Sequence, residues 1–105
     1  MSCATVSFTI PDTVSALGEA AFSGSRLSMV VIPEGISVIP QDCFAHCYSL
    51  TSITIPEGVE EIRSAAFLGC VELSTVTMPE SLRYIDYSVF NGCDRLREVR
   101  IPNED

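Results

Sequence analysis

The sequence predicts an α/β solenoid, in which short coils stack through parallel β-sheet and are closed by short helical or 3-10 turns. Three sets of residues recur with a period of 22 or 23 residues. They are the prolines Pro11, Pro33, Pro56, Pro79 and Pro102, the phenylalanines Phe22, Phe44, Phe67 and Phe90, and the leucines Leu27, Leu50, Leu73 and Leu96. A fixed period of this length is typical of repeat architectures, because a lone coil cannot bury its own apolar face.

Each repeat begins with a predicted strand, which is clearest at Thr51 to Ile55. The alternation of side chains along a strand turns Ile53 and Ile55 inward and their neighbours outward. Pro56 ends the strand because it has no amide hydrogen to donate to a sheet. Stacked coils should therefore form a parallel sheet with one apolar face.

The rest of the repeat returns the chain to its starting side. Glu57 and Gly58 form a predicted turn, and Ile62 brings a further apolar group to the core. The segment Ser64 to Gly69 is expected to form a helical or 3-10 turn that places Phe67 inside. Its closing glycine permits the positive φ that such a turn requires.

The chain is expected to be a single domain of four coils, at residues 5–27, 28–50, 51–73 and 74–96, followed by the start of a fifth at Ile101-Pro102. The first strand should begin the stack with Val6, Phe8 and Ile10 pointing inward. Neither end carries a clear capping repeat, although repeat arrays need caps. Three explanations are open: terminal tails cover the ends, the chain is part of a longer array, or it associates end to end.

Composition excludes several classes of function. The chain has 105 residues, 47% of them hydrophobic, and a net charge of −8. Its six basic residues are all arginine, and this acidic balance argues against a nucleic-acid surface. No apolar run approaches the roughly 20 residues that span a bilayer, so membrane insertion is not expected. Met1 to Thr5 has neither a basic start nor an apolar stretch, so no signal peptide is expected in this chain.

Three of the five cysteines share the repeat period: Cys47, Cys70 and Cys93. This placement favours buried thiols that serve as small core residues. A second reading remains open, because Cα atoms one coil apart lie within the range that a disulfide tolerates. One stacked pair could then oxidise and leave the third thiol free.

A cluster at Cys43, His46 and Cys47 contains residue types that bind metals or form nucleophile pairs. Both cysteines, however, occupy columns that should face the core. A structural zinc site needs four ligands, and no fourth is near in the sequence. A catalytic pair would also lack its third group. We therefore expect no metal site, no cofactor and no enzymatic activity.

Two charged groups recur along the solenoid. The turn prolines are followed by acidic residues: Asp12, Glu34, Glu57 and Glu80. This ladder either holds a cation or basic partner or, as we expect, is a solvated edge that keeps an apolar solenoid soluble. Arg95, Arg97 and Arg100 gather in the last coil, where they could pair with Asp94 and Glu98 or meet an acidic neighbour end to end.

The outward-facing residues of the strands are the leading candidates for binding, because solenoids use extended faces for recognition. The candidate site residues lie in two columns: Ser52, Thr75 and Glu98, and Thr54, Thr77 and Arg100. Met29 and Val31 continue these columns in the second coil. A second candidate patch comprises the tyrosines Tyr48, Tyr84 and Tyr87, which are expected to lie off the strands.

Two sequence blocks resemble a known family. From Leu50 to Val59 the chain reads Leu-Thr-Ser-Ile-Thr-Ile-Pro-Glu-Gly-Val, and Ala66-Phe67-x-Gly69-Cys70 follows. Over about residues 5–102 these blocks resemble BspA-type leucine-rich repeats. Pro-Glu-Gly stands where other leucine-rich repeats carry Asn or Cys. The first coil departs from the pattern at Ser25, and the second has His46 where the others have glycine.

The resemblance implies a curved solenoid and a role on the cell surface in adhesion to host matrix proteins or in coaggregation. It transfers no functional residue, because the repeat residues are scaffold. The expected function is a non-catalytic protein-binding module of the adhesion or cell-surface type. The alternative is an intracellular protein-interaction scaffold, which free thiols and the lack of a signal in this chain favour. The expected partner is a protein ligand, with end-to-end self-association as a further possibility, and the sequence leaves the compartment unknown.

Overall fold

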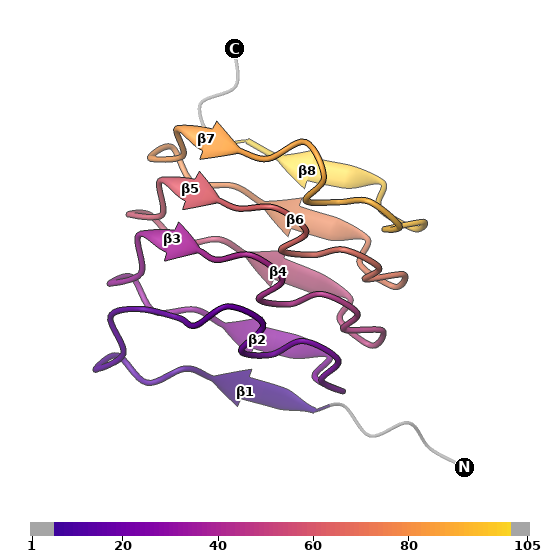
Figure 1. Cartoon of the computed structure of the whole chain (residues 1–105), viewed down its shortest axis with the longest axis horizontal. Coiled ribbons are helices and arrows are strands. Elements are labelled where there is room, and N and C mark those ends of the chain that lie inside the picture. Colours follow the sequence, from indigo (N-terminus) through magenta and orange to yellow (C-terminus); the bar gives the residue numbers. More distant parts are fainter. Residues whose placement is uncertain (1–5, 102–105) are drawn as a thin grey trace.

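The computed structural model describes residues 6–101 and shows a solenoid of about four turns (Figure 1). Three sequence-based expectations lie outside these residues. They are the absence of a signal peptide in Met1 to Thr5, the thiol of Cys3 and the turn proline Pro102 of the fifth coil.

Parallel strands form two walls of the solenoid (Figure 1). The first wall contains β1 (Ser7–Thr9), β2 (Met29–Val31), β4 (Ser52–Thr54), β6 (Thr75–Thr77) and β8 (Glu98–Arg100). The second wall contains β3 (Val38–Ile39), β5 (Glu61–Ile62) and β7 (Tyr84–Ile85). Hydrogen bonds join β1 to β2, β3 to β5 to β7, and β4 to β6 to β8, and every pair is parallel.

The register of the first wall confirms the predicted strand orientation. Ile53 pairs with Val76, and Val76 pairs with Val99, so one repeat position lies directly above another. Ile53 and Ile55 are buried, as the alternation predicts. Pro56 follows the strand, and Gly58 closes the turn with φ +103°.

The third side of the solenoid consists of turns and differs from the expectation. No helix occurs among residues 6–101, so the helical or 3-10 character expected for Ser64 to Gly69 is not found. The hydrogen bonds explain why. The amide of Leu68 donates to Ala65 O in its own coil at 3.1 Å, whereas the amide of Phe67 donates to Val89 O in the next coil at 3.1 Å. Because alternate amides leave the coil, the uninterrupted bonding of a helix cannot form.

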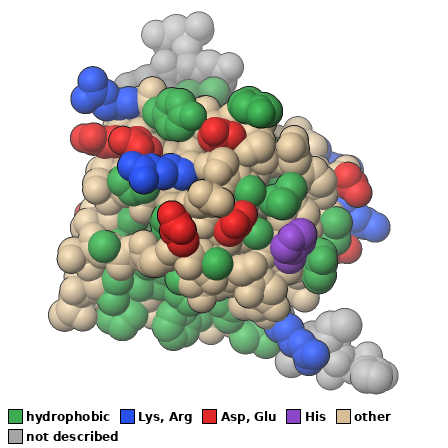
Figure 2. Space-filling view, in the orientation of Figure 1, with side chains coloured by type: hydrophobic (Ala, Val, Ile, Leu, Met, Phe, Trp, Pro, Cys, Tyr) green, Lys and Arg blue, Asp and Glu red, His purple; other side chains and the backbone are tan. Residues whose placement is uncertain are grey.

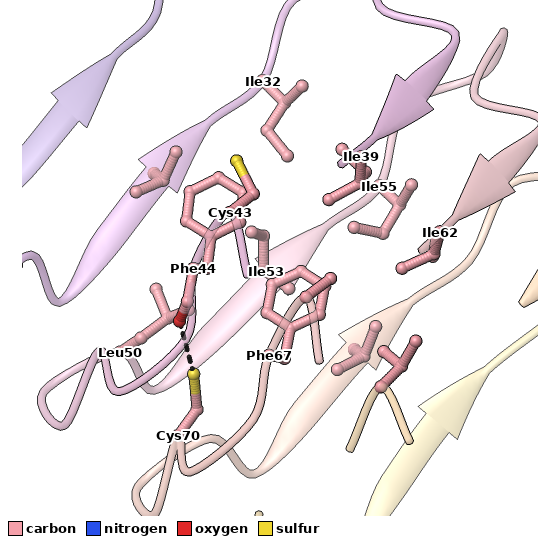
Figure 3. Packing of buried hydrophobic residues seen from close by; sticks show 14 of the residues in the cluster. Ile32, Ile39, Cys43, Phe44, Leu50, Ile53, Ile55, Ile62, Phe67 and Cys70 are labelled. Atoms are coloured by element: carbon pink, nitrogen blue, oxygen red, sulfur yellow. Dashed lines mark hydrogen bonds between the residues drawn. The ribbon is translucent and has the colours of Figure 1, made fainter. Parts of the chain in front are cut away.

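The core runs through the solenoid between the walls and the turns (Figure 3). The rings of Phe22, Phe44, Phe67 and Phe90 stack in sequence, with centroids 5.3, 5.4 and 5.9 Å apart. The second and third coils bury the inner columns fully. These residues include Ile36, Ile39, Leu50, Val59, Ile62 and Leu73. The ladder-like core is the one that the repeat columns predict.

Val6 and Phe8, which were expected to point inward, remain partly exposed. Their exposed fractions are 43% and 42%, although Ile10 is buried as expected. The ring of Phe8 touches Phe22, with centroids 6.0 Å apart, but no described coil stacks on the outer side of β1. Figure 2 shows apolar side chains gathered along this edge of the molecule. An inward position in a repeat therefore becomes an exposed apolar surface in the first coil.

Candidate functional site

The first wall places the six candidate binding residues in two straight columns. Ser52 pairs with Thr75, which pairs with Glu98, and Thr54 pairs with Thr77, which pairs with Arg100. All six side chains are half-buried or exposed, whereas Ile53 and Val76, which lie between them on β4 and β6, are buried. Since the strands are flat and parallel, the columns form a continuous face with one side chain per coil.

This face, hereafter the strand face, changes character along the solenoid. At the second coil it carries the exposed apolar side chains of Met29 and Val31. It passes through small hydroxyl residues and ends on the ion pair between Arg100 and Glu98, whose N–O distance is 3.0 Å. An exposed pair of this kind adds little stability. The strand face therefore runs from apolar to charged side chains along the solenoid.

The arginines of the last coil are only partly paired as expected. Arg100 contacts Glu98, as the sequence suggested. Arg95 instead faces Glu72 in the preceding coil, with an N–O distance of 3.8 Å. The stacking of coils places Glu72 next to Arg95. Because the two residues lie one repeat apart, the residues adjacent to Arg95 in the sequence do not predict this contact.

The acidic ladder is fully exposed, and one part of it is structural. The Oε2 atom of Glu57 accepts a hydrogen bond from the amide of Glu80 at 2.9 Å. Asp12 and Glu34 line a hollow of about 460 Å³ between the first turns. In the described part of the chain, no ion pair joins either of these two carboxylates to an arginine.

The tyrosines do not form the single patch that the sequence suggested. Tyr84 lies on strand β7, where it had been expected off the strands. Its hydroxyl donates to Asp86 Oδ2 at 3.2 Å. Tyr48 lies after the turn of the second coil, and its hydroxyl meets His46 Nδ1 at 3.4 Å. Tyr87 is 95% exposed, and within residues 6–101 no ring contact joins two tyrosines.

The carboxylate of Asp86 accepts hydrogen bonds from two neighbouring residues, Tyr84 and Ser88. The hydroxyl of Ser88 donates to Asp86 Oδ1 at 2.6 Å and the amide of Ser88 donates to the same atom at 2.9 Å. These bonds, together with the one from Tyr84, lower the pKa of Asp86. The hydroxyl oxygen of Ser88 also accepts a hydrogen bond from the amide of Ala65 at 3.1 Å. Asp86 and Ser88 together therefore fix the corner after β7 against the preceding coil.

The cysteine column, Cys47, Cys70 and Cys93, forms a ladder of free thiols, of which the first two are buried. Each cysteine donates a hydrogen bond from its thiol to the carbonyl oxygen of a phenylalanine in the preceding coil, and the Sγ–O distance is 3.1 Å in all three pairs. The pairs are Cys47 to Phe22, Cys70 to Phe44 and Cys93 to Phe67. Figure 3 shows the bond from Cys70 to Phe44. All three are free thiols, so the thiol reading describes this structure and the disulfide reading does not.

The Cys43, His46 and Cys47 cluster combines two buried thiols with one exposed imidazole. Cys43 and Cys47 point into the core, whereas His46 is exposed at a backbone φ of +60°. Burial raises the pKa of Cys43 to about 12. Hydrogen bonding with Cys47 and burial also raise the pKa of Cys70. Among residues 6–101, no group of three or more His, Cys, Asp or Glu residues is arranged to hold a metal ion.

Thiol labelling should follow this burial. In the folded protein we expect a water-soluble thiol reagent to modify Cys93 first, because it is the one partly exposed thiol among residues 6–101. Cys43, Cys47 and Cys70 should react only when the chain opens. The measurement is mass spectrometry of digests of a Cys3→Ser variant, labelled with and without denaturant. Rapid modification of Cys70 under native conditions would contradict the packing described above.

Two hollows were not anticipated from the sequence. One lies at the end of the solenoid that carries β8 and has a volume of about 530 Å³. It is lined mainly by apolar residues: Met78, Pro79, Leu82, Ile85, Phe90, Val99 and Ile101. The other is a crevice of about 200 Å³ between β2 and β4, which opens on the strand face. The repeat pattern is similar in every coil. It therefore does not predict the hollow at the end that carries β8, nor the separation of β2 from β4.

Within the described residues, no helix combines the length and the apolarity needed to cross a membrane. The absence of helices is a property of the solenoid, whose coils consist of strands and turns.

Comparison with known proteins identifies close structural relatives. A leucine-rich cell surface protein from Faecalibacterium prausnitzii superposes with a TM-score of 0.91 and 34% sequence identity, over 94% of this chain and 26% of that one. A leucine-rich repeat protein from Bacteroides ovatus superposes with a TM-score of 0.84 and 34% identity, over 92% of this chain and 25% of that one. This chain therefore spans about a quarter of the length of either relative.

No curated protein matches the chain. The family model for the BspA type leucine-rich repeat region matches residues 1–105 with 6 copies of the repeat. This match covers the whole chain and agrees with the stacked 23-residue coils described above. The chain belongs to the BspA-type leucine-rich repeat family.

Proposed function

We propose that this chain is a non-catalytic protein-binding module, and that its site is the strand face. The observation that carries the proposal is the registered pair of columns formed by Ser52, Thr54, Thr75, Thr77, Glu98 and Arg100. Repeat solenoids bind through many modest contacts spread over such a surface. Small hydroxyl side chains leave the face open to an approaching partner, and the charged residues at its end add orientation.

The class of partner that we propose is a host matrix or cell-surface protein. Support comes from the relative described as a leucine-rich cell surface protein, which shares the coil geometry over 94% of this chain. The alternative is an intracellular interaction scaffold, which the reduced state of Cys43, Cys47, Cys70 and Cys93 favours. The two roles use the same face and differ in the compartment and the partner.

The test measures binding of the purified chain to immobilised matrix proteins at physiological salt. Its key variant is Thr54→Arg with Thr77→Arg, which adds bulk and charge to the centre of the strand face. The control, Ser23→Arg with Ser49→Arg, adds the same charge at exposed turn residues. Saturable binding that only the strand-face variant loses supports the proposal. Binding lost equally in both variants would indicate a charge effect, and no binding to any matrix protein would favour the scaffold.

A second interaction is suggested by the apolar hollow of about 530 Å³ beside β8. Within residues 6–101, strand β8 pairs with β6 alone, so no described strand covers its outer edge, next to exposed Val99 and Ile101. Such an edge can accept another strand. We propose that the β1 end of a second copy docks there, where Phe8 is exposed.

Sedimentation over a range of protein concentrations tests this end-to-end contact. Association that rises with concentration and is lost in a Val99→Glu variant would support it. A chain that stays monomeric, or a Val99→Glu variant that still associates, would rule this contact out.

A further inference from the structure

The sheet of the first wall is interrupted between β2 and β4. Hydrogen bonds join β1 to β2 and β4 through β6 to β8, but no ladder connects these two sheets. Figure 1 shows the wider spacing between the two strands. The amide of Ile10 donates to Val31 O at 3.0 Å, and the amide of Ile55 donates to Thr77 O at 2.8 Å. Within residues 6–101, the equivalent bond from the amide of Ile32 to Thr54 O is not formed.

The separation is confined to the strand face. The second and third coils are joined in the second wall, where Ile39 pairs with Ile62. They are also joined on the turn side, where the amide of Phe44 donates to Ala66 O at 2.8 Å. The rings of Phe44 and Phe67 stack at 5.4 Å, which is as close as elsewhere in the core. The coils therefore stack normally on two sides. On the third side the amide of Thr51 still donates to Ser28 O at 3.2 Å, and the opening lies further along the two strands.

The opening is a defined crevice of about 200 Å³. Its lining comprises Met29, Val30, Val31, Ile32, Ser52, Ile53, Thr54 and Pro56. Small-molecule sites usually enclose about 300–1,000 Å³, so this volume suits one side chain better than a separate ligand. Protein interfaces obtain much of their binding energy from single apolar or aromatic anchors seated in pockets of this kind.

An acidic hollow continues the crevice. The crevice and the neighbouring hollow of about 460 Å³ share Val31, Ile32 and Pro56 in their linings. Asp12 and Glu34 line the far part of that hollow, and both are exposed. A partner segment whose side chain enters the crevice would therefore also pass the acidic hollow, whose two carboxylates favour a basic group close to the apolar anchor.

We propose that the β2–β4 crevice is the anchor pocket of the strand face, and that it takes an apolar side chain from an extended segment of a partner protein with a lysine or arginine close by. The unpaired amide of Ile32 is placed to donate to the main chain of that segment, as at the edge of a sheet. This inference rests on the proposed protein-binding role of the strand face. It adds the position and the chemistry of the strongest contact.

The test uses isotope-labelled protein and blocked peptides followed by amide chemical shifts. One peptide carries a leucine and an arginine two residues apart, and two others replace the leucine with alanine or the arginine with glutamate. We expect the first peptide to shift the amides of Val30 to Ile32 and of Ile53 and Thr54. Each altered peptide should bind about tenfold more weakly, as expected for the loss of one anchor contact.

Two matched variants locate the site. Ser52→Trp should fill the crevice and abolish the shifts. Ser49→Trp introduces the same ring at an exposed turn residue outside the strand face and should bind like the wild type. Equal loss in both variants, equal binding of all three peptides, or no shift at millimolar peptide would overturn the proposal. Shifts at the crevice that follow protein concentration without peptide would assign it to a second copy instead.

The same variants separate this inference from the proposed function. If the wild type binds a matrix protein and Ser52→Trp binds it equally well, the strand face stands and the crevice is not its anchor. If no matrix protein binds but the leucine and arginine peptide shifts the crevice amides, the anchor pocket stands and the adhesion role does not.

Discussion

Replacing Phe67 with alanine is expected to lower the free energy of unfolding by about 3–5 kcal/mol, the usual cost of removing a buried phenylalanine. Phe67 is fully buried, and its ring stacks on Phe44 at 5.4 Å and on Phe90 at 5.9 Å. The variant would therefore lose the packing of two neighbouring coils at once. Small domains have a stability of only about 5–15 kcal/mol, so this change should leave a marginally folded chain.

Urea unfolding followed by circular dichroism measures the effect, and Thr77→Arg is its control. Thr77 belongs to the strand face, so its replacement should change the stability by no more than about 0.5 kcal/mol. The loss of stability in Phe90→Ala should lie between those of the other two variants, because Phe90 is only half-buried at the end of the stack. If the chain tolerates Phe67→Ala and Thr77→Arg equally, the register of the coils proposed here is wrong.

Gly58→Ala is expected to be the second most damaging change, with a cost of about 1–3 kcal/mol for the backbone conformation alone. Gly58 has φ +103°, a conformation that residues with a Cβ atom rarely adopt. An added Cβ would also lie 3.0 Å from the carbonyl oxygen of Glu34 in the coil below. Because that oxygen belongs to the backbone, the two coils would have to move apart.

The matched control is Gly35→Ala, at the same position of the preceding repeat. Gly35 is not among the positive-φ glycines of the described residues, and its added Cβ would lie 3.9 Å from its nearest neighbour, Val14 O. Alanine there should stabilise the chain by about 0.4–1 kcal/mol, because it restricts the unfolded state. Urea midpoints at an unchanged m-value give both numbers. A similar loss in both variants would show that the shape of the turn, and not the specific backbone angle, is responsible.

The repeat columns predicted the core well because each position has the same surroundings in every inner coil. Ile53, Phe67 and Cys70 are buried for the same reason as their counterparts one repeat away. The reasoning failed where the surroundings differ. Val6 and Phe8 occupy inward positions, but no described coil lies beneath them, and they are exposed. The turn after Ile62 was expected to be helical because spacing alone does not reveal that alternate amides bond to the next coil.

The strand face was predicted in position but not in detail. Alternation along a strand is enough to point Thr54 and Thr77 outward and to place them in one column. It is not enough to reveal the crevice between β2 and β4, because the residues of that coil fit the repeat pattern. The distance between two strands depends on contacts between the turns and walls of neighbouring coils. The residues that make these contacts lie about one repeat apart in the sequence.

The alternation of backbone hydrogen bonds in the turns has a consequence for how the chain folds. The amides of Phe44 and Phe67 find their acceptors, Ala66 O and Val89 O, only in the next coil. A lone coil therefore leaves its turn amides unpaired, and every contact that completes it closes a loop of about one repeat. The first pairing of two coils should be a slow nucleation step, and each later coil should add to an existing template with the same loop-closure cost. Amide exchange should then show zipper-like opening, with the end coils exchanging fastest and the second and third coils last.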